Sequence, residues 1–364
     1  MVGMRDVAKK AGVSLSTVSL VVNGNGYVSD DMRERVRKAM QLLNYVPNEL
    51  ARNLYHDRTN LVGVIVPTIR HPFFATFTAH LQHALAAQGL RTMLCSTADE
   101  ADGEIQYVDM LRRHMMDGII MFVMCAHTSH PGDYWTSIHR PIVAFDRVLG
   151  DGISSIGSDH EQGGRLIAQM LIRNGTKHVV MIGGPRDQFF DLAARGEVEE
   201  GPFDLGKTTF PTVRYYLTLE QELTSAGVKY EYVEAGEVMD FAGYHRAVSN
   251  ALDKVTTDGV DAVVSSDIGA SFCVREALSR GISIPDELQI VAYDGTYLTD
   301  LAGMKLTAVA QDFSAIAQST ADHIVQAIAN EEVATANASR RDIPKPFEPN
   351  VLIPMTLVPG DTTR

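Results

Sequence analysis

The sequence predicts a small all-α head joined to a larger α/β body, whose two lobes are built on parallel, doubly wound sheets. Two patterns predict this division. Up to about residue 46, apolar residues recur at helical spacing between serine and glycine signals, whereas from Leu61 short apolar runs alternate with helical segments. A chain of 364 residues is also long enough for two or three compact units. We therefore expect a head at residues 1–46, a connecting segment at 47–60 and the body at 61–364.

The charge is distributed unevenly along the chain. Residues 1–58 contain nine Lys/Arg and six Asp/Glu, a net charge of +3, while the other residues contain 23 and 39, a net charge of −16. Because phosphate contacts supply most non-specific affinity for DNA, a basic head on an acidic body is typical of a protein whose head binds nucleic acid. Such a small excess is also compatible with ordinary scatter, so the charge alone does not decide.

The head begins with two short helices joined by a tight turn. The apolar residues of the first helix share one face, at Val7, Ala8 and Ala11. Gly12 ends this helix, and Ser14 can cap a second helix that runs from Leu15 to Val22. Two short helices joined by a glycine turn make a helix-turn-helix.

A third helix is expected to close the core of the head. Ser29 can cap it, and we expect Pro47 to end it. Its inward stripe contains Val36, Met40 and Leu43. A three-helix bundle with no role in DNA binding would show the same local pattern.

In a helix-turn-helix, the second helix lies in the major groove and its first residues reach base edges. The side chains expected to face the bases are Leu15, Ser16, Ser19 and Leu20. The hydroxyls of Ser14 and Thr17 are better placed for phosphates. Asn23 and Tyr45 are further candidates for DNA contact.

The head contains the segments DVAKKAGVSLSTVSLVVNG and VSDDMRERVRKAMQLLNYVPNELARNL. Over some fifty residues, these segments closely resemble the N-terminal signature of the lac repressor family without a gap. The resemblance implies a bacterial transcription regulator that binds operator DNA. Leu20 departs from the family pattern, because the family usually has Arg there. We therefore expect the operator to be read at that step by apolar contact with a thymine methyl instead of a bidentate contact to guanine.

By the same resemblance, residues 47–60 contain a hinge helix that pairs with its mate in the minor groove and inserts a leucine between base steps. Leu54 holds the position of that leucine, and Asn48 and Ala51 are neighbouring candidates for DNA contact. So short a helix is marginal alone, which suits a segment that folds on DNA. A plain linker is the alternative interpretation.

The body is expected to contain two sets of strands. Apolar runs without polar alternation predict strands buried on both faces, at 61–66, 91–95, 117–122 and 141–145, and then at 177–182, 228–233, 262–265 and 288–293. Segments with helical spacing lie between them, such as 77–88 and 104–114. We expect one lobe at about 61–157 and 291–312, the other at about 158–290 and 313–364, and a cleft between them.

Ligands of open α/β sheets bind at the carboxyl ends of the strands. Aromatic and charged residues follow the predicted strands at Phe73, Phe74, Asp146, Arg147 and Asp267. Apolar ring faces and charged forks are the groups that hold a polyhydroxylated ring. Together with Phe241, these residues are expected to line a sugar-binding cleft, although each one alone could equally be an ion-pair partner or a loop cap.

The resemblance extends along the body nearly to Arg364 and implies a periplasmic-binding-protein-like fold. The ligand-contacting aspartates of the family match Asp146 and Asp267, although Ser266 replaces the Asn that usually precedes the second. The ligand-gripping Arg of the family matches Arg214 if residues 186–212 are an insertion, and Arg195 is the competing match. The motifs FDR at 145–147 and YDGT at 293–296 are most similar to the sucrose operon repressors of the family.

No catalytic, cofactor or metal site is expected, so the protein is not expected to be an enzyme. The glycine-containing loops lack nucleotide-binding spacing, and no Ser, Cys or Thr lies in a nucleophile elbow. The cysteines Cys95, Cys125 and Cys273 are expected to be buried packing residues. Scattered histidines, His71 among them, are expected in loops or at the surface.

These observations predict a sequence-specific repressor of carbohydrate-utilisation genes that a small sugar, such as sucrose, releases from operator DNA. We expect a homodimer, because each head reads half of a palindrome, and a cytoplasmic protein, because the sequence has neither a signal peptide nor an apolar membrane span. Two alternatives stay open: a regulator whose effector strengthens DNA binding, as in the purine repressor, and a sugar-binding protein without a regulatory role.

Overall fold

The computed structural model describes residues 2–24, 26–47, 58–97, 103–122, 135, 137–149, 152–184, 211–236, 241–336 and 350–364. The chain divides into two units, the head Met1–Thr59 and the body Asn60–Arg364. The predicted hinge residues Asn48, Ala51 and Leu54 lie outside the described residues, as do Arg195, Cys125 and residues 186–210 of the expected insertion.

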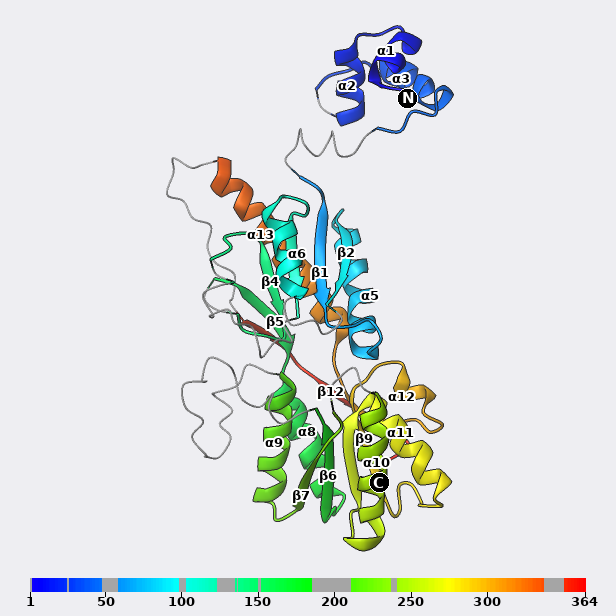
Figure 1. Cartoon of the computed structure of the whole chain (residues 1–364), viewed down its shortest axis with the longest axis vertical. Helices are drawn as coiled ribbons and strands as arrows, with labels where there is room; N and C mark the ends of the chain where they lie inside the picture. Colours follow the sequence, from blue (N-terminus) through cyan, green and yellow to red (C-terminus); the bar gives the residue numbers. More distant parts are fainter. Residues whose placement is uncertain are drawn as a thin grey trace. The chain divides into compact units, whose positions relative to one another are not determined.

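The head is a bundle of three helices, α1 (Met4–Ala11), α2 (Leu15–Asn23) and α3 (Asp30–Leu42) (Figure 1). Its core is formed by the fully buried Val7, Val18 and Val36, packed with small alanines. Ser14 and Ser29 cap α2 and α3 as predicted, because each hydroxyl accepts from a backbone N–H in the first turn.

α3 also holds the end of α1. Gly12 adopts a φ of 66°, and the Arg35 guanidinium donates to the Ala11 carbonyl at 2.8 and 3.2 Å and to the Gly12 carbonyl at 2.9 Å. The last carbonyls of a helix have no partner within it. Arg35 supplies that partner and thereby ties α1 to α3.

α3 ends at Leu42, so the predicted end at Pro47 is wrong. Asn44 takes a φ of 46°, and the Tyr45 N–H donates to the Met40 carbonyl at 2.9 Å. This bond and the left-handed residue close the helix in the manner of a Schellman motif. Asn is the residue besides glycine that best tolerates this conformation, a signal that the sequence interpretation overlooked.

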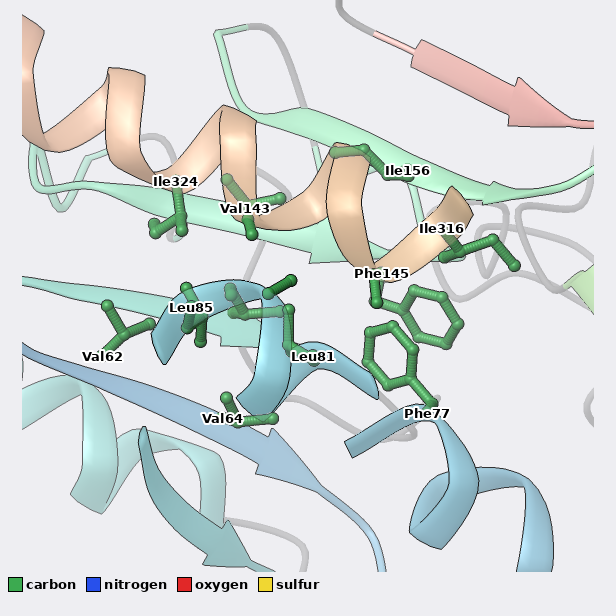
Figure 2. Packing of buried hydrophobic residues seen from close by; sticks show 14 of the residues in the cluster. Val62, Val64, Phe77, Leu81, Leu85, Val143, Phe145, Ile156, Ile316 and Ile324 are labelled. Carbon is green, nitrogen blue, oxygen red and sulfur yellow. The ribbon is translucent and has the colours of Figure 1, made fainter. Parts of the chain in front are cut away.

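The first lobe of the body contains a parallel six-stranded sheet in the order β11-β5-β4-β3-β1-β2. Its strands are β1 (Leu61–Val66), β2 (Arg91–Ser96), β3 (Gly118–Met121), β4 (Ile142–Phe145), β5 (Ser154–Ser158) and β11 (Asn350–Ile353). Its helices are α5 (Pro72–Ala87), α6 (Gly103–Arg112) and α13 (Phe313–Ala336). α5 and α13 pack on one face, where Leu81, Phe145 and Ile316 belong to one buried cluster (Figure 2), and α6 packs on the other face.

The second lobe contains another six-stranded sheet, in the order β12-β10-β9-β8-β6-β7, in which only β12 runs antiparallel to its neighbour. Its strands are β6 (His178–Gly183), β7 (Lys229–Glu234), β8 (Ala262–Ser266), β9 (Gln289–Asp294), β10 (Thr307–Ala310) and β12 (Thr356–Val358). Its helices are α8 (His160–Arg173), α9 (Pro211–Ser225), α10 (Phe241–Thr257), α11 (Asp267–Ser279) and α12 (Leu298–Leu301). α8 and α9 cover one face, and α10 and α11 cover the other.

The described chain crosses between the lobes three times, at residues 158–160, 310–313 and 353–356. This corrects the predicted lobe boundaries, which gave 291–312 to the first lobe and all of 313–364 to the second. β9 and β10 belong to the second sheet, while α13 and β11 return to the first. An apolar run predicts a strand but not the sheet that the strand joins, which is why the boundaries were wrong.

The predicted strands are present, but β2 is not buried on both faces as expected. Among the strands that the structure describes, β2 lies at the sheet edge beside β1, and Cys95 is the one buried residue of β2. Cys95 and Cys273 are buried as predicted, and burial raises the pKa of their thiols to about 11 and about 12. Among the described helices, none combines the length and the apolar character needed to cross a bilayer.

The Arg35 contact predicts a local change in stability. Arg35→Ala removes three hydrogen bonds from the end of α1, and because about half of the side chain is exposed we expect a cost of about 1 kcal/mol. Amide exchange in residues 4–12 of the full chain should rise about fivefold, measured by hydrogen–deuterium exchange. Arg37→Ala, at an exposed position of the same helix, is the control, and equal exchange in both variants would contradict the role of Arg35.

Candidate DNA-binding and effector sites

α2 presents an apolar surface to solvent. Leu15 and Leu20 are 43% and 37% exposed, and Ser16 lies exposed beside them. The helix contains no charged residue, and only Val18 of its side chains is buried. Val18 packs into the core of the head, whereas Leu15 and Leu20 lie on the exposed side of α2, so that side is available for contact with another molecule.

The polar residues of α2 are partly engaged within the helix. The Ser14 hydroxyl accepts from the Thr17 N–H at 3.0 Å and lies 2.8 Å from the Thr17 hydroxyl. Asn23 donates to the Ser19 hydroxyl at 3.2 Å. These contacts hold the side chains at defined positions, as a surface that reads base edges requires.

Two tyrosines of the head lie in different surroundings. Tyr45, a predicted DNA contact, packs half-buried against the core of the head. Tyr27, between α2 and α3, is 94% exposed and was not among the predicted contacts. The sequence signal that could have identified Tyr27 is an aromatic residue directly after the glycine-containing turn NGNG, where it is expected to be exposed.

Phe73 and Phe74 are core residues, which corrects the expectation that they offer open ring faces. α5 begins at Pro72, earlier than the predicted helix at residue 77, so both rings lie in its first turn and point into the lobe. Phe73 stacks on Phe145 with 5.7 Å between ring centroids, and Phe74 meets the edge of Phe122 at 4.9 Å. Both rings are buried.

Asp146 directly follows β4 and has a backbone conformation that is unusual for a residue other than glycine. Its φ is 56°, and its Oδ1 accepts from the Ser158 N–H at 3.1 Å and lies 3.2 Å from His160 Nε2. A Cβ on Gly157 would lie 2.0 Å from this oxygen, so only glycine fits there. The carboxylate is thus held in place by the start of the next crossover.

Asp267 begins α11, directly after β8, as predicted. Its carboxylate accepts from the backbone N–H groups of Gly295 and Thr296, at 3.2 and 2.5 Å. Burial raises its pKa to about 6, although these hydrogen bonds act in the opposite direction. Ser266, which replaces the family's Asn, donates to the Tyr244 hydroxyl at 3.0 Å.

Asp294 is a third carboxylate at a strand end, and the sequence analysis named it only as part of a motif. It ends β9 with a φ of 110°, and its Oδ1 accepts from Gln311 Nε2 at 2.8 Å. Burial and the neighbouring charge of Asp267 raise its pKa well above the usual value of 3.8. A carboxylate that directly follows a buried strand was the signal that could have identified it.

Buried tyrosines of the second lobe lie close to Asp294. The rings of Tyr215 and Tyr293 stack with 3.8 Å between centroids, and burial raises the pKa of both well above 10. Tyr293 also hydrogen-bonds to His160 Nδ1 through its hydroxyl. The carboxylates of the second lobe therefore lie in a region of low polarity, where hydrogen bonds are strong.

The other predicted ligand residues are placed as follows. Arg147 is buried directly after Asp146. Arg214 lies in the first turns of α9, with Nη2 3.8 Å from Glu161 Oε1. Phe241 begins α10, and the Arg70 guanidinium lies 5.4 Å from its ring centroid. One face of Phe241 is therefore already covered by a cation, which sugar stacking on that face would have to displace.

His71 lies in the loop between β1 and α5, within the expectation of a loop or surface position, but it is buried. Its Nδ1 accepts from the Phe73 N–H at 3.3 Å and caps α5, and burial lowers its pKa to about 4. A neutral histidine can serve as a helix cap in this way. Within the described ranges, no group of three His, Cys, Asp or Glu side chains could hold a metal ion.

Family models match most of the chain. The model for bacterial regulatory proteins, lacI family, matches residues 3–48. The model for periplasmic binding proteins and sugar binding domain of LacI family matches residues 59–197, and that for a periplasmic binding protein-like domain matches residues 168–363. These matches agree with the division into a helical head and a two-sheet body.

Individual proteins are similar over the same length. A sucrose operon repressor of Streptococcus mutans serotype c is 30% identical, covering 99% of this chain and 98% of its own. A ribose operon repressor of Halalkalibacterium halodurans is 31% identical, covering 85% and 86%. Among solved structures, the lac repressor dimer bound to operator and an anti-inducer superposes with a TM-score of 0.76 at 22% identity, covering 100% and 99%. The predicted fold class is confirmed.

Because the pKa of Asp294 is raised, replacing it with the uncharged asparagine is predicted to stabilise the protein by an amount that depends on pH. The pKa of this carboxyl group is higher in the folded than in the unfolded protein, so the folded state disfavours its ionisation. The folded protein therefore becomes less stable as the pH rises above the pKa of the unfolded state. Asp294→Asn keeps an acceptor for Gln311 without the charge. We expect its melting temperature at pH 7.5 to exceed that of the wild type by about 2 °C or more, and the gain to vanish towards pH 4.

Differential scanning calorimetry at pH 4, 6 and 7.5 measures this gain. Asp312→Asn, at an exposed helix cap, is the matched control and should show no such trend. A constant difference between Asp294→Asn and the wild type at every pH would contradict the electrostatic explanation.

Proposed function

Because the chain belongs to the lacI family of bacterial regulatory proteins, we propose that it represses carbohydrate-utilisation genes, with operator DNA bound by the head and a small sugar bound by the body. One observation carries this proposal. A capped, uncharged helix with exposed leucines is joined in one chain to a two-lobed body whose strands end in buried carboxylates. Exposed leucines and buried carboxylates both cost stability, which is expected where side chains serve the binding of another molecule.

The head is proposed to read bases mainly through α2. Leu15, Ser16, Ser19 and Leu20 are the proposed base contacts, and Ser14 and Thr17 the proposed phosphate contacts. A leucine side chain offers apolar contact to a thymine methyl and no hydrogen bond to guanine. The proposed operator therefore has an A·T pair opposite Leu20. The proposed minor-groove contacts are Asn48, Ala51 and Leu54.

The body is proposed to hold the sugar by its hydroxyl groups. Asp146, Asp267 and Asp294 are acceptors fixed by backbone and side-chain donors, and Arg214 is the proposed guanidinium partner. A site built from fixed acceptors rejects ligands that lack the matching hydroxyls. The relatives named for sucrose and ribose operons make these two sugars the first candidates, sucrose before ribose.

Sugar binding is proposed to control the head by a population shift within a homodimer. Each subunit reads one half of a palindromic operator, and the sugar changes the angle between the lobes in each body. Because the two binding sites are coupled, operator DNA must weaken sugar binding by the same factor by which sugar weakens operator binding. Because operator DNA lies in the bacterial chromosome, the protein is proposed to act in the cytoplasm.

A paired binding experiment tests the proposed function. Thermal shift of the full chain against sucrose, ribose and other mono- and disaccharides identifies the sugar, since a ligand at 100 times its Kd stabilises the protein by roughly 2.7 kcal/mol. Mobility shift with duplexes from the region upstream of its own gene then identifies the operator. We expect the stabilising sugar to weaken the DNA complex.

Each outcome of this experiment has a distinct meaning. A sugar that strengthens the DNA complex would support the alternative regulator, whose effector acts as a co-repressor. Sugar binding without any DNA binding would leave only the sugar-binding protein. Failure to bind every duplex and every sugar would refute the proposal.

The position of Leu20 predicts a change in base preference. Leu20→Arg should gain a preference for guanine at one step of each half-site, worth about 1–3 kcal/mol, because arginine can bond both acceptors of guanine. Selection of bound sequences from a randomised duplex pool measures the preference of the variant and of the wild type.

Leu42→Arg provides the matched control, because Leu42 is 71% exposed at the end of α3 and the added charge is the same. It should raise affinity for all duplexes without changing base preference. If both variants select the same sequences, Leu20 does not contact a base.

A further inference from the structure

Hydrogen bonds link residues of both lobes where the chain crosses between them, and the peptide bond between Tyr293 and Asp294 closes these links into a ring. Ser158 Oγ donates to Gln311 Oε1 at 2.7 Å, and Gln311 Nε2 donates to Asp294 Oδ1 at 2.8 Å. On the other side, Asp146 Oδ1 contacts both the Ser158 N–H and His160, and His160 bonds to Tyr293, the neighbour of Asp294. All these residues are buried.

The ring joins parts of the chain that are far apart in sequence. Ser158 lies in the first crossover, Gln311 in the second, and Asp294 at the end of β9 in the second lobe. Gln311 is therefore in contact with a strand-end carboxylate of one lobe and with the last residue of β5 in the other. A change in the angle between the lobes has to move at least one of these contacts.

The ring is maintained at a cost in backbone conformation. Asp146 and Asp294 have φ values of 56° and 110°, and Gly157 has no room for a Cβ. Strained backbone of this kind persists only where surrounding contacts hold it, and it is concentrated at functional sites. The two residues with strained backbone are the two carboxylates of the ring themselves.

We propose that Gln311 is the positioning residue that transmits the state of Asp294 to the first crossover. Its amide is planar, so the donor that binds Asp294 and the acceptor that binds Ser158 turn together. A ligand hydroxyl that takes the Asp294 oxygen displaces the Gln311 donor, and the turn of the amide releases Ser158. The inference rests on the proposed function only in making a sugar the ligand that does so.

The third crossover offers an independent contact for comparison. Gln162 Oε1 accepts from the Met355 N–H at 2.7 Å, and the Asp159 N–H donates to the Ile353 carbonyl at 2.8 Å. Gln162 is also an amide side chain beside a crossover, but this hydrogen bond is with a backbone group and not with a strand-end carboxylate. Loss of this contact loosens the region between the lobes without involving Asp294.

The test is a set of variants of the full chain, followed by hydrogen–deuterium exchange of a peptide covering residues 154–163. Asp294→Ala removes the acceptor and stands in for a carboxylate taken by ligand. We expect exchange at Ser158 and Asp159 to rise about fivefold, as for the loss of one net hydrogen bond. Asp294→Asn keeps the acceptor and should restore exchange to within about twofold of the wild type.

Combined variants decide whether the signal passes through Gln311. Gln311→Leu should raise exchange as Asp294→Ala does, and the double variant should show no further rise. Gln162→Leu should leave the full effect of Asp294→Ala in place. If Asp294→Ala raises exchange equally with and without Gln311, or has no effect in the wild-type background, the inference is refuted.

Sucrose and ribose extend the test to ligands. A sugar that stabilises the body should raise exchange at Ser158 in the wild type and not in Gln311→Leu, and an equal rise in both would refute the inference. If neither sugar stabilises the body, the choice of sucrose or ribose as effector fails, while the variants alone still decide whether Asp294 and Ser158 are linked through Gln311.

Discussion

The arrangement of the body depends on one constraint: the chain passes between its two lobes at three places that must fit side by side. Each passage carries backbone from the carboxyl end of a strand in one sheet to a helix or strand of the other, so its polar groups lie in the interior and need partners. Ser158, Gln311 and Gln162 provide partners for one another or for backbone groups across these passages. Two of the strand-end carboxylates, Asp146 and Asp294, are held by Ser158 and Gln311.

Burial of the carboxylates lowers the stability of the folded protein, but it also provides a binding site with acceptors that are fixed in advance. Asp267 and Asp294 lie in a region lined by tyrosines, where burial raises the pKa of both carboxyl groups and the charge of Asp267 further raises that of Asp294. Such groups reduce stability near neutral pH, yet they are acceptors already fixed in place before a ligand arrives. Fixed acceptors lower the ordering cost of binding, which is the usual reason for tolerating strain of this kind.

The sequence was sufficient for the features that local pattern encodes. Helix caps at Ser14 and Ser29, the buried strands and the carboxylates at Asp146 and Asp267 all follow from residues within a few positions of one another. The errors concern longer distances or competing signals. The lobe boundaries, and the pairing of Ser158 with Gln311 across 153 residues, have no local pattern. Phe73 and Phe74 were misplaced because α5 starts five residues earlier than its apolar spacing suggested.

α2 contains no lysine, arginine, aspartate or glutamate, which separates two properties that DNA-binding helices often combine. Affinity for a duplex responds to ionic strength in proportion to the phosphates that are neutralised. In this head the cations lie outside α2, among them Lys9, Lys10, Arg33 and Lys38. In the proposed complex, added salt would therefore weaken binding to every duplex alike, while the ratio of affinities for a matched and a mismatched base pair at the leucines would stay nearly constant.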